Sequence, residues 1–364
     1  MMEVESFWNE RYWLPPGVTW ADVEKFKNQG GSIPHLSDLW IVIPIAFSMI
    51  LIRRVFEEAI STPIAKRVGI KNKRTAKPES CPILEKYSKS HRRLERGDLP
   101  DLLSKLDKDW NERRIERWFR RKKAQGTRPL TAKFGETMWR GFFYTLAYSY
   151  GTYVVMANTW FWDTLDCWRN FPLQDLTWDV KYYYIAELAF YLSLCCTLLS
   201  DTIRKDFLAQ IIHHVATIAL ITFSYACGFT RIGVLVMWLH DISDIFLEIA
   251  KCFVYAERQA IADHFFNIFA VVFFISRIIY FPFVVLHTTW IKSMWLFEPF
   301  FGYYFFNFLL MVLQILHLYW FYLILDMAYR LLKGKNVTDS RSDEEFSVDE
   351  SDNDNQNLSD KKGK

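Results

Sequence analysis

Long apolar stretches, separated by shorter polar ones, run through most of this 364-residue chain. A stretch of about 20 apolar residues is enough for a helix to cross a bilayer, because each residue adds about 1.5 Å to the helix. The pattern therefore predicts an all-α integral membrane protein with about seven transmembrane helices. They are expected near residues 36–52, 138–157, 182–200, 207–228, 231–255, 262–286 and 303–332.

The region between the first two apolar stretches has a different pattern. Within residues 66–128, the segments "ILEKYSKSH", "DLPDLLSKLD" and "NERRIERWFRRKKAQ" each fit a short helix, so a small three-helix module is expected. Asp98 is the expected N-cap of the second helix. Residues 335–364 are acidic and poor in apolar residues, which predicts a disordered tail.

Charge adds an orientation to this picture. Residues 66–128 hold 21 Lys and Arg against 9 Asp and Glu, a balance of +12, although the whole chain has a net charge of only +3. Basic loops stay in the cytosol, so the module is expected there, after a first transmembrane helix at 36–56. Residues 1–35 would then be lumenal and the C-terminus cytosolic.

Polar residues inside the fourth and fifth stretches are costly in lipid. Gln210, His213 or His214, Thr217 and Ser224 recur at helical spacing, which predicts one polar stripe. Each charge near the middle of a transmembrane helix costs roughly 3 kcal/mol on insertion scales. A polar interior cavity that opens to the cytosol is therefore expected, and the fifth stretch contributes His240, Asp241, Asp244 and Glu248.

Imidazole and carboxylate groups in such a cavity suit acyl transfer. A neutral imidazole is a nucleophile and a base near neutral pH, and a neighbouring carboxylate can fix its tautomer. Neither a Gly-x-Ser-x-Gly elbow nor a phosphate-binding Gly-x-x-x-x-Gly-Lys loop occurs, which disfavours a serine acyltransferase and a nucleotide hydrolase. The six cysteines lack metal-ligand spacing. The alternative is a zinc ion held by His213, His240, Asp241 and Asp244, although no metal is expected.

The segment "KDFLAQIIHHVATIALITFSYACGFTRIGVLVMWLHDISDIFLEIAK", residues 205–251, closely resembles the Lag1 motif of ceramide synthases. "FWNERYWLPPGVTWADVE" and "FFISRIIYFPF" are similar to other parts of that family. The resemblance implies a TLC catalytic domain at 131–332, with six helices around a lipid cavity in the endoplasmic reticulum membrane. The family's essential positions fall on His213, His214, His240, Asp241 and Asp244.

The resemblance also implies a reaction. A ceramide synthase, or sphingosine N-acyltransferase, moves the acyl chain of a fatty acyl-CoA to the amine of a sphingoid base. The thioester supplies the free energy, so no cofactor is expected. His213 could form an acyl-imidazole or could deprotonate the amine for direct attack; the sequence leaves both routes open. A non-enzymatic TLC-domain protein that binds or transports lipid is the competing interpretation.

Further polar positions are expected to contact substrate. Arg204 and Lys205 lie at the expected cytosolic mouth, where CoA phosphates would bind. The segment "HTTWIKSMWLFEPF" lies where the family selects acyl-chain length, and "FFGYYFFN" resembles members that use long and very long chains. The remaining expected substrate contacts are Gln210, Thr217, Ser224, Glu248, Ser276, Arg277 and Asn307.

The third helix of the module resembles a homeodomain recognition helix. A DNA reader needs Asn where this chain has Arg121, so no sequence-specific nucleic acid is expected, and Trp118 and Phe119 are expected in the module's core. The tail predicts phosphorylation at Ser340, Ser342, Ser347 and Ser351, which precede acidic residues. The expected partners are the two substrates, the bilayer and a second copy or relative in a dimer.

Overall fold

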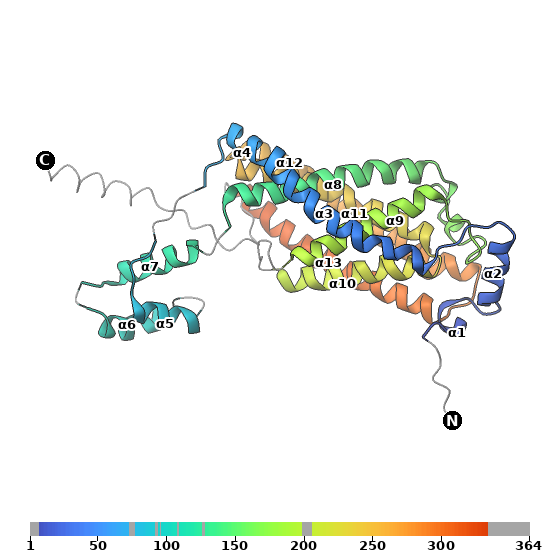
Figure 1. Ribbon diagram of the computed structural model, residues 1–364, viewed down its shortest axis with the longest axis horizontal. Helices are drawn as coiled ribbons and strands as arrows, with labels where there is room; N and C mark the ends of the chain where they lie inside the picture. Colours follow the sequence, from blue (N-terminus) through green and yellow to red (C-terminus); the bar gives the residue numbers. More distant parts are fainter. Residues whose placement is uncertain are drawn as a thin grey trace, which may run out of the picture. The chain divides into compact units, whose positions relative to one another are not determined.

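The computed structural model describes residues 7–72, 77–91, 94, 96–107, 109–125, 128–198 and 206–333, and these residues form helices and connecting loops. Contacts between residues divide the chain into two compact units. The larger lies within Met1–Lys71 and Thr131–Asp339, and the smaller includes Asn72–Leu130 (Figure 1). The expected phosphorylation sites and the acidic tail lie outside the described residues.

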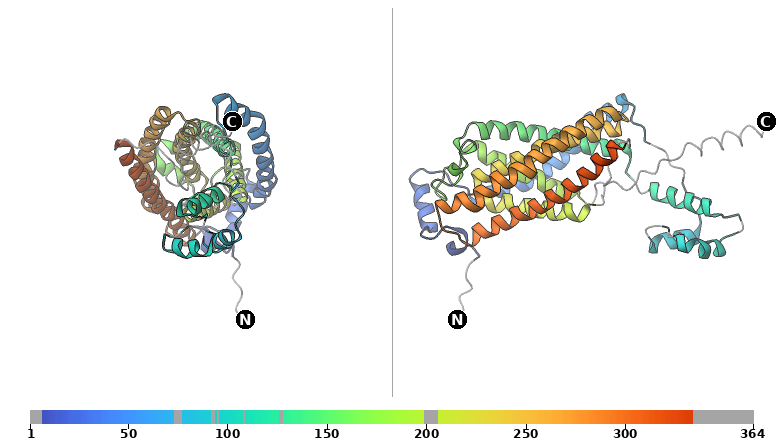
Figure 2. Two further views of the ribbon diagram at one scale, coloured as in Figure 1. Left: turned by 90° about the vertical axis from the view of Figure 1, so that its left-hand side faces the viewer. Right: turned by 180° about the vertical axis from the view of Figure 1, so that it is seen from behind.

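Each of the seven apolar stretches forms a helix in the larger unit. Viewed end-on, the helices of this unit are arranged as a ring (Figure 2). Among the pairs in contact are α9 with α10, α10 with α13, and α11 with α12. The helices are α3 (Val42–Phe56), α8 (Leu130–Met156), α9 (Trp178–Thr197), α10 (Phe207–Ala226), α11 (Thr230–Tyr255), α12 (Gln259–Phe273) and α13 (Phe301–Leu332).

Four helical segments in the described part of the chain are long and apolar enough to cross a membrane: Leu36–Val68, Phe207–Ala226, Gln259–Trp295 and Phe301–Leu332. The protein is therefore a helical integral membrane protein, as the apolar pattern predicts. The other three expected spans are helices that fall short of the same criterion. Helix α11 shows why, because it includes Asp241, Asp244, Glu248 and Lys251 within one otherwise apolar helix.

Two of the spans are longer than the apolar pattern predicts. A 3₁₀ turn, η1 (Leu36–Ile41), precedes α3, and a π-helical turn, η2 (Glu57–Ser61), leads into α4 (Thr62–Val68). Gly69 then ends the helix with φ +90°, a conformation that favours glycine. Helix α12 continues through η6 (Phe274–Leu286), η7 (Thr288–Lys292) and η8 (Ser293–Trp295). Pro282 lies inside η6, where it has no N–H to donate to the preceding turn.

Aromatic side chains close one end of the ring. Trp13 of α1 (Glu10–Trp13) is buried and stacks on Phe223 of α10 with ring centroids 5.3 Å apart. The loop after α8, which includes η4 (Thr159–Phe161) and η5 (Thr164–Cys167), brings Trp168 against Phe229 and Phe297. Stacked aromatic rings combine a large buried area with a defined geometry, so they fix this end firmly.

The short helix α2 (Trp20–Asn28) begins with a capping box. The Thr19 hydroxyl and backbone N–H donate to the Asp22 carboxylate, while the Asp22 N–H donates to the Thr19 hydroxyl. The hydrogen bond from the Thr19 hydroxyl, and after it the one from the Thr19 backbone N–H, lower the pKa of Asp22 below its ordinary value. The sequence "TWAD" therefore sets the start of this helix.

The smaller unit contains the three expected helices, α5 (Pro82–Ser90), α6 (Leu99–Lys105) and α7 (Glu112–Gln125). Trp118 is buried in its core and Phe119 packs against it, as predicted. Asp98, the last residue of η3 (Arg96–Asp98), is the N-cap of α6, but its side chain makes no capping bond to the described residues of that helix. It accepts a hydrogen bond from the Tyr87 hydroxyl instead, which ties α5 to α6.

Candidate active site

A cavity lies among α9, α10, α11 and α13. His213 on α10 and His240 on α11 lie at one end of it. From His213 to Ser224 the wall spans eleven residues of α10, or about 16 Å. The cavity is mainly apolar; its lining includes Thr217, Leu220, Ile221, Phe229, Val236, Met237, Tyr303, Phe306, Leu310 and Leu313.

The adjacent histidines on α10 have different surroundings. His213 lines the cavity and packs edge-on against Trp320, whereas His214 is not part of the lining. Both rings contact Tyr191 of α9, with centroid distances of 6.2 and 6.1 Å. The Nδ1 atoms of both are buried and have no hydrogen-bond partner among the described residues. Of the two, only His213 is therefore placed to meet a molecule in the cavity.

His240 is held at both ring nitrogens. Its Nδ1 lies 2.6 Å from the Val236 carbonyl oxygen, one turn earlier in α11. Its Nε2 lies 2.9 Å from Nε2 of His317, on α13. His213, His240 and His317 are also close enough to interact electrostatically. Three helices thus bring three imidazoles together at one end of the cavity.

The two aspartates on α11 point to different neighbours. Asp241 is fully buried, accepts a hydrogen bond from Tyr183 on α9 at 3.2 Å, and lies beside the buried carboxyl of Glu187. Asp244 pairs with Arg277 of η6 at 2.9 Å. The same guanidinium nitrogen donates to the His240 carbonyl oxygen at 2.8 Å. These contacts hold α11 against α9 and η6.

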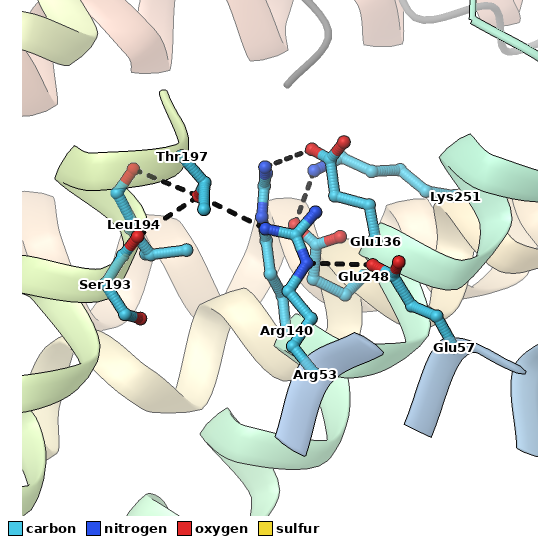
Figure 3. A network of polar contacts seen from close by, with 9 residues as sticks. All are labelled: Arg53, Glu57, Glu136, Arg140, Ser193, Leu194, Thr197, Glu248 and Lys251. Carbon is cyan, nitrogen blue, oxygen red and sulfur yellow. Dashed lines mark hydrogen bonds and ion pairs between the residues drawn. The ribbon is translucent and has the colours of Figure 1, made fainter. Parts of the chain in front are cut away.

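Glu248 belongs to a group of buried charges farther along α11, in which Lys251 donates to Glu248 at 2.6 Å (Figure 3). In the same group Arg140 pairs with Glu136 on α8, and Arg53 pairs with Glu57 at 2.8 Å. Arg53 also donates to Thr197 of α9. Three basic and three acidic side chains therefore balance one another where these helices meet.

The cavity includes only some of the residues expected to bind substrate. Thr217, Ser224 and Asn307 line it with His213, so three residues of the predicted α10 stripe share one face. Gln210 does not line it, and Ser276 donates a long bond of 3.5 Å to the Phe273 carbonyl of its own helix. Arg204 and Lys205 lie outside the described residues.

The carboxylates that were expected to share a cavity with the histidines do not line this one. Asp241, Asp244 and Glu248 are absent from its lining, and it extends from the histidines along the later part of α10 and the earlier part of α13. Asp241 and Glu248 are nevertheless interior, being 1% and 4% exposed, as their cost in lipid predicts. Each has a protein partner instead of facing open space.

Several residues of this site escaped sequence reasoning. His317, Tyr183 and Glu187 are each at most 1% exposed and contact the predicted residues directly. The signal that could have indicated them is the same one that identified His213, an ionisable side chain inside an apolar stretch. Among the described residues, no three His, Cys, Asp or Glu side chains come together as metal ligands would.

Comparison with known proteins gives a consistent result. The TLC domain family model matches residues 133–326, slightly more than half of the chain. Human ceramide synthase 3 is 43% identical over 343 residues, covering 94% of this chain and 88% of that protein. Human ceramide synthase 5 is 40% identical over 95% of this chain and 88% of its own length. Ceramide synthase hyl-1 of Caenorhabditis elegans is 28% identical over 94% and 85%.

Proposed function

We propose that His213 is the reacting group of this chain, which belongs to the ceramide synthase family. The chain is accordingly an N-acyltransferase that joins an acyl group from fatty acyl-CoA to the amine of a sphingoid base.

One observation carries the assignment of His213. Of the two histidines that line the cavity, His240 has both ring nitrogens hydrogen-bonded, whereas Nδ1 of His213 has no partner in the described part of the chain. Asp244 is paired with Arg277, and Asp241 accepts from Tyr183. An imidazole with a free nitrogen is the nucleophile or base that acyl transfer needs.

The proposed reaction has two steps. A ring nitrogen of neutral His213 attacks the thioester carbonyl carbon, the carbon–sulfur bond breaks, and CoA leaves as the thiolate, which takes up the proton from the other ring nitrogen. The neutral amine of the sphingoid base then attacks the acyl-imidazole, the amide bond forms, and His213 is released and takes up the proton that the amine loses. Because the intermediate is itself an activated acyl group, the second step needs no further source of free energy.

The cavity suits the acyl chain. Its apolar wall runs from His213 toward Ser224, so a chain attached at His213 would extend along α10 into the apolar part. We further propose that α8, α9 and α11 cross the membrane with the four apolar segments, giving seven spans in the endoplasmic reticulum. The basic residues after α3 favour a lumenal N-terminus and a cytosolic C-terminus. A dimer and a preference for long or very long chains remain part of this proposal.

Intact-protein mass spectrometry tests the mechanism. The purified protein is incubated with a long-chain acyl-CoA and no sphingoid base, and peptide mapping locates any added mass. We expect one acyl group on His213, absent in His213→Ala and discharged by sphinganine. Ceramide formation by wild type without any adduct would favour direct transfer with His213 as base. Neither adduct nor product with any chain length would favour a lipid-binding protein.

The cavity wall predicts a change in acyl-chain preference. Leu310 is 5% exposed and lines the cavity, so Leu310→Trp adds bulk to the space available to the chain. We expect the product spectrum to shift toward shorter acyl chains, because a steric stop discriminates more strongly than one methylene, which is worth only about 0.8 kcal/mol. Liquid chromatography with mass spectrometry of ceramides made from an acyl-CoA mixture measures the shift.

The matched control for Leu310→Trp is Ile315→Trp on the same helix. Ile315 is 62% exposed and lies outside the cavity lining, so this substitution should leave the chain-length distribution as it is in wild type. An identical distribution for all three proteins would mean that the acyl chain lies elsewhere.

A further inference from the structure

We propose that His317 is a positioning residue that fixes the proton of His240 on Nδ1 and keeps the His240 ring in place beside His213. His317 lies on α13, 77 residues beyond His240, and it does not line the cavity. It would therefore act through His240. This inference rests on the proposed function of His213.

The hydrogen bonds around the pair determine where its protons lie. The partner of His240 Nδ1 is a backbone carbonyl, which only accepts, so Nδ1 must carry a proton. A neutral His240 then has a bare Nε2 that can only accept. Because this Nε2 lies 2.9 Å from Nε2 of His317, the His317 nitrogen must donate the proton between them.

The surroundings of His317 support this arrangement. His317 is 0% exposed, and Phe281 packs edge-on against both rings of the pair, with centroid distances of 5.5 Å to His240 and 4.9 Å to His317. Nδ1 of His317 is buried without a partner among the described residues. A third proton on the pair would need an acceptor at that nitrogen. With one proton on His240 Nδ1 and one on His317 Nε2, the three ring nitrogens that have partners all make their hydrogen bonds.

The arrangement has a consequence for the reaction. His240 forms part of the cavity wall at the His213 end, yet its nitrogen lone pair is already committed to His317. His240 is thus held as a fixed wall and does not compete with His213 for the acyl group or the proton. Without the His317 donor, a buried acceptor would be unsatisfied and the ring would be free to turn.

Two substitutions separate the donor from the packing. The amide of Gln reaches the position of Nε2 and can donate to His240, whereas Leu keeps the volume and removes the donor. We expect His317→Gln to retain at least about a third of the wild-type kcat, and His317→Leu to lose about 10–100-fold. The KM for acyl-CoA should change less than about twofold in both, because His317 lies outside the cavity. Equal kcat values for wild type and His317→Leu would overturn the proposal, as would equal losses in both variants.

A double-mutant cycle shows whether His317 acts through His240. In a His240→Leu background, His317→Leu should change single-turnover acyl transfer by less than about twofold, because its target is absent. If the loss in the double variant equals the product of the losses in the two single variants, the positioning role is overturned. Thermal melting shows whether His317→Leu folds. If it does not, His317→Asn replaces it, because the shorter Asn amide cannot reach the Nε2 position. Equal kcat values for His317→Asn and His317→Gln would then refute the proposal. A wild-type protein without His213 adduct or ceramide product would instead refute the proposed function, independently of this pair.

Discussion

The Arg277→Met variant is expected to lose about 3 kcal/mol of folding free energy, the lower end of the range for breaking a buried ion pair. Arg277 is 5% and Asp244 22% exposed at the side chain, and their atoms are 2.9 Å apart. Removing the guanidinium leaves the carboxylate without its counter-charge and removes one donor from the His240 carbonyl. Thermal melting of the purified protein in detergent measures the loss as a lower melting temperature.

Two further variants test whether this loss comes from the buried charge. Arg330→Met removes an ion pair of the same type on α13, but its side chains are 52% and 38% exposed, so it should cost less than about 1 kcal/mol. The double variant Arg277→Met with Asp244→Leu removes both charges and should recover part of the lost stability. If the single variants Arg277→Met and Arg330→Met have the same melting temperature, the view that the Arg277 pair holds α11 to η6 is contradicted.

Much of the fold could be predicted from the sequence, because an apolar stretch long enough to cross a bilayer is expected to form a helix. Each of the seven apolar stretches is a helix, and the module's three helices lie where short amphipathic segments predict them. The ends were harder to predict. The helical segment that begins at Gln259 continues past Leu286 to Trp295, since helical hydrogen bonding persists into polar sequence such as Thr288 and Thr289.

The candidate site was only partly predictable, because helical spacing defines a face but not its neighbour. Spacing correctly placed His213, Thr217 and Ser224 on one wall. On α11, successive residues point about 100° apart, so two neighbours in the sequence can have different surroundings. His240 faces the cavity, while Asp241 meets Tyr183 on α9.

The partners from other helices could not be deduced from periodicity. His317 lies 77 residues from His240, and Arg277 lies 33 residues from Asp244. Such pairs depend on which helices are neighbours and how each is rotated, and one sequence contains neither fact. The burial cost of an ionisable group predicts only that it has a partner.

Replacing His213 with Ala is expected to lower kcat/KM for ceramide formation by about a thousandfold or more, because it removes the group proposed to attack the thioester.

The neighbouring His214 supplies the matched control. His214 is half-buried like His213 and also has an unpartnered Nδ1 among the described residues, but it does not line the cavity. The loss in His214→Ala should therefore be at least about tenfold smaller. Transfer of a labelled acyl group from acyl-CoA to sphinganine measures both, with thermal melting to exclude unfolding. Equal losses in the two variants would mean that access to this cavity does not select the reacting imidazole, and the assignment of His213 would fail.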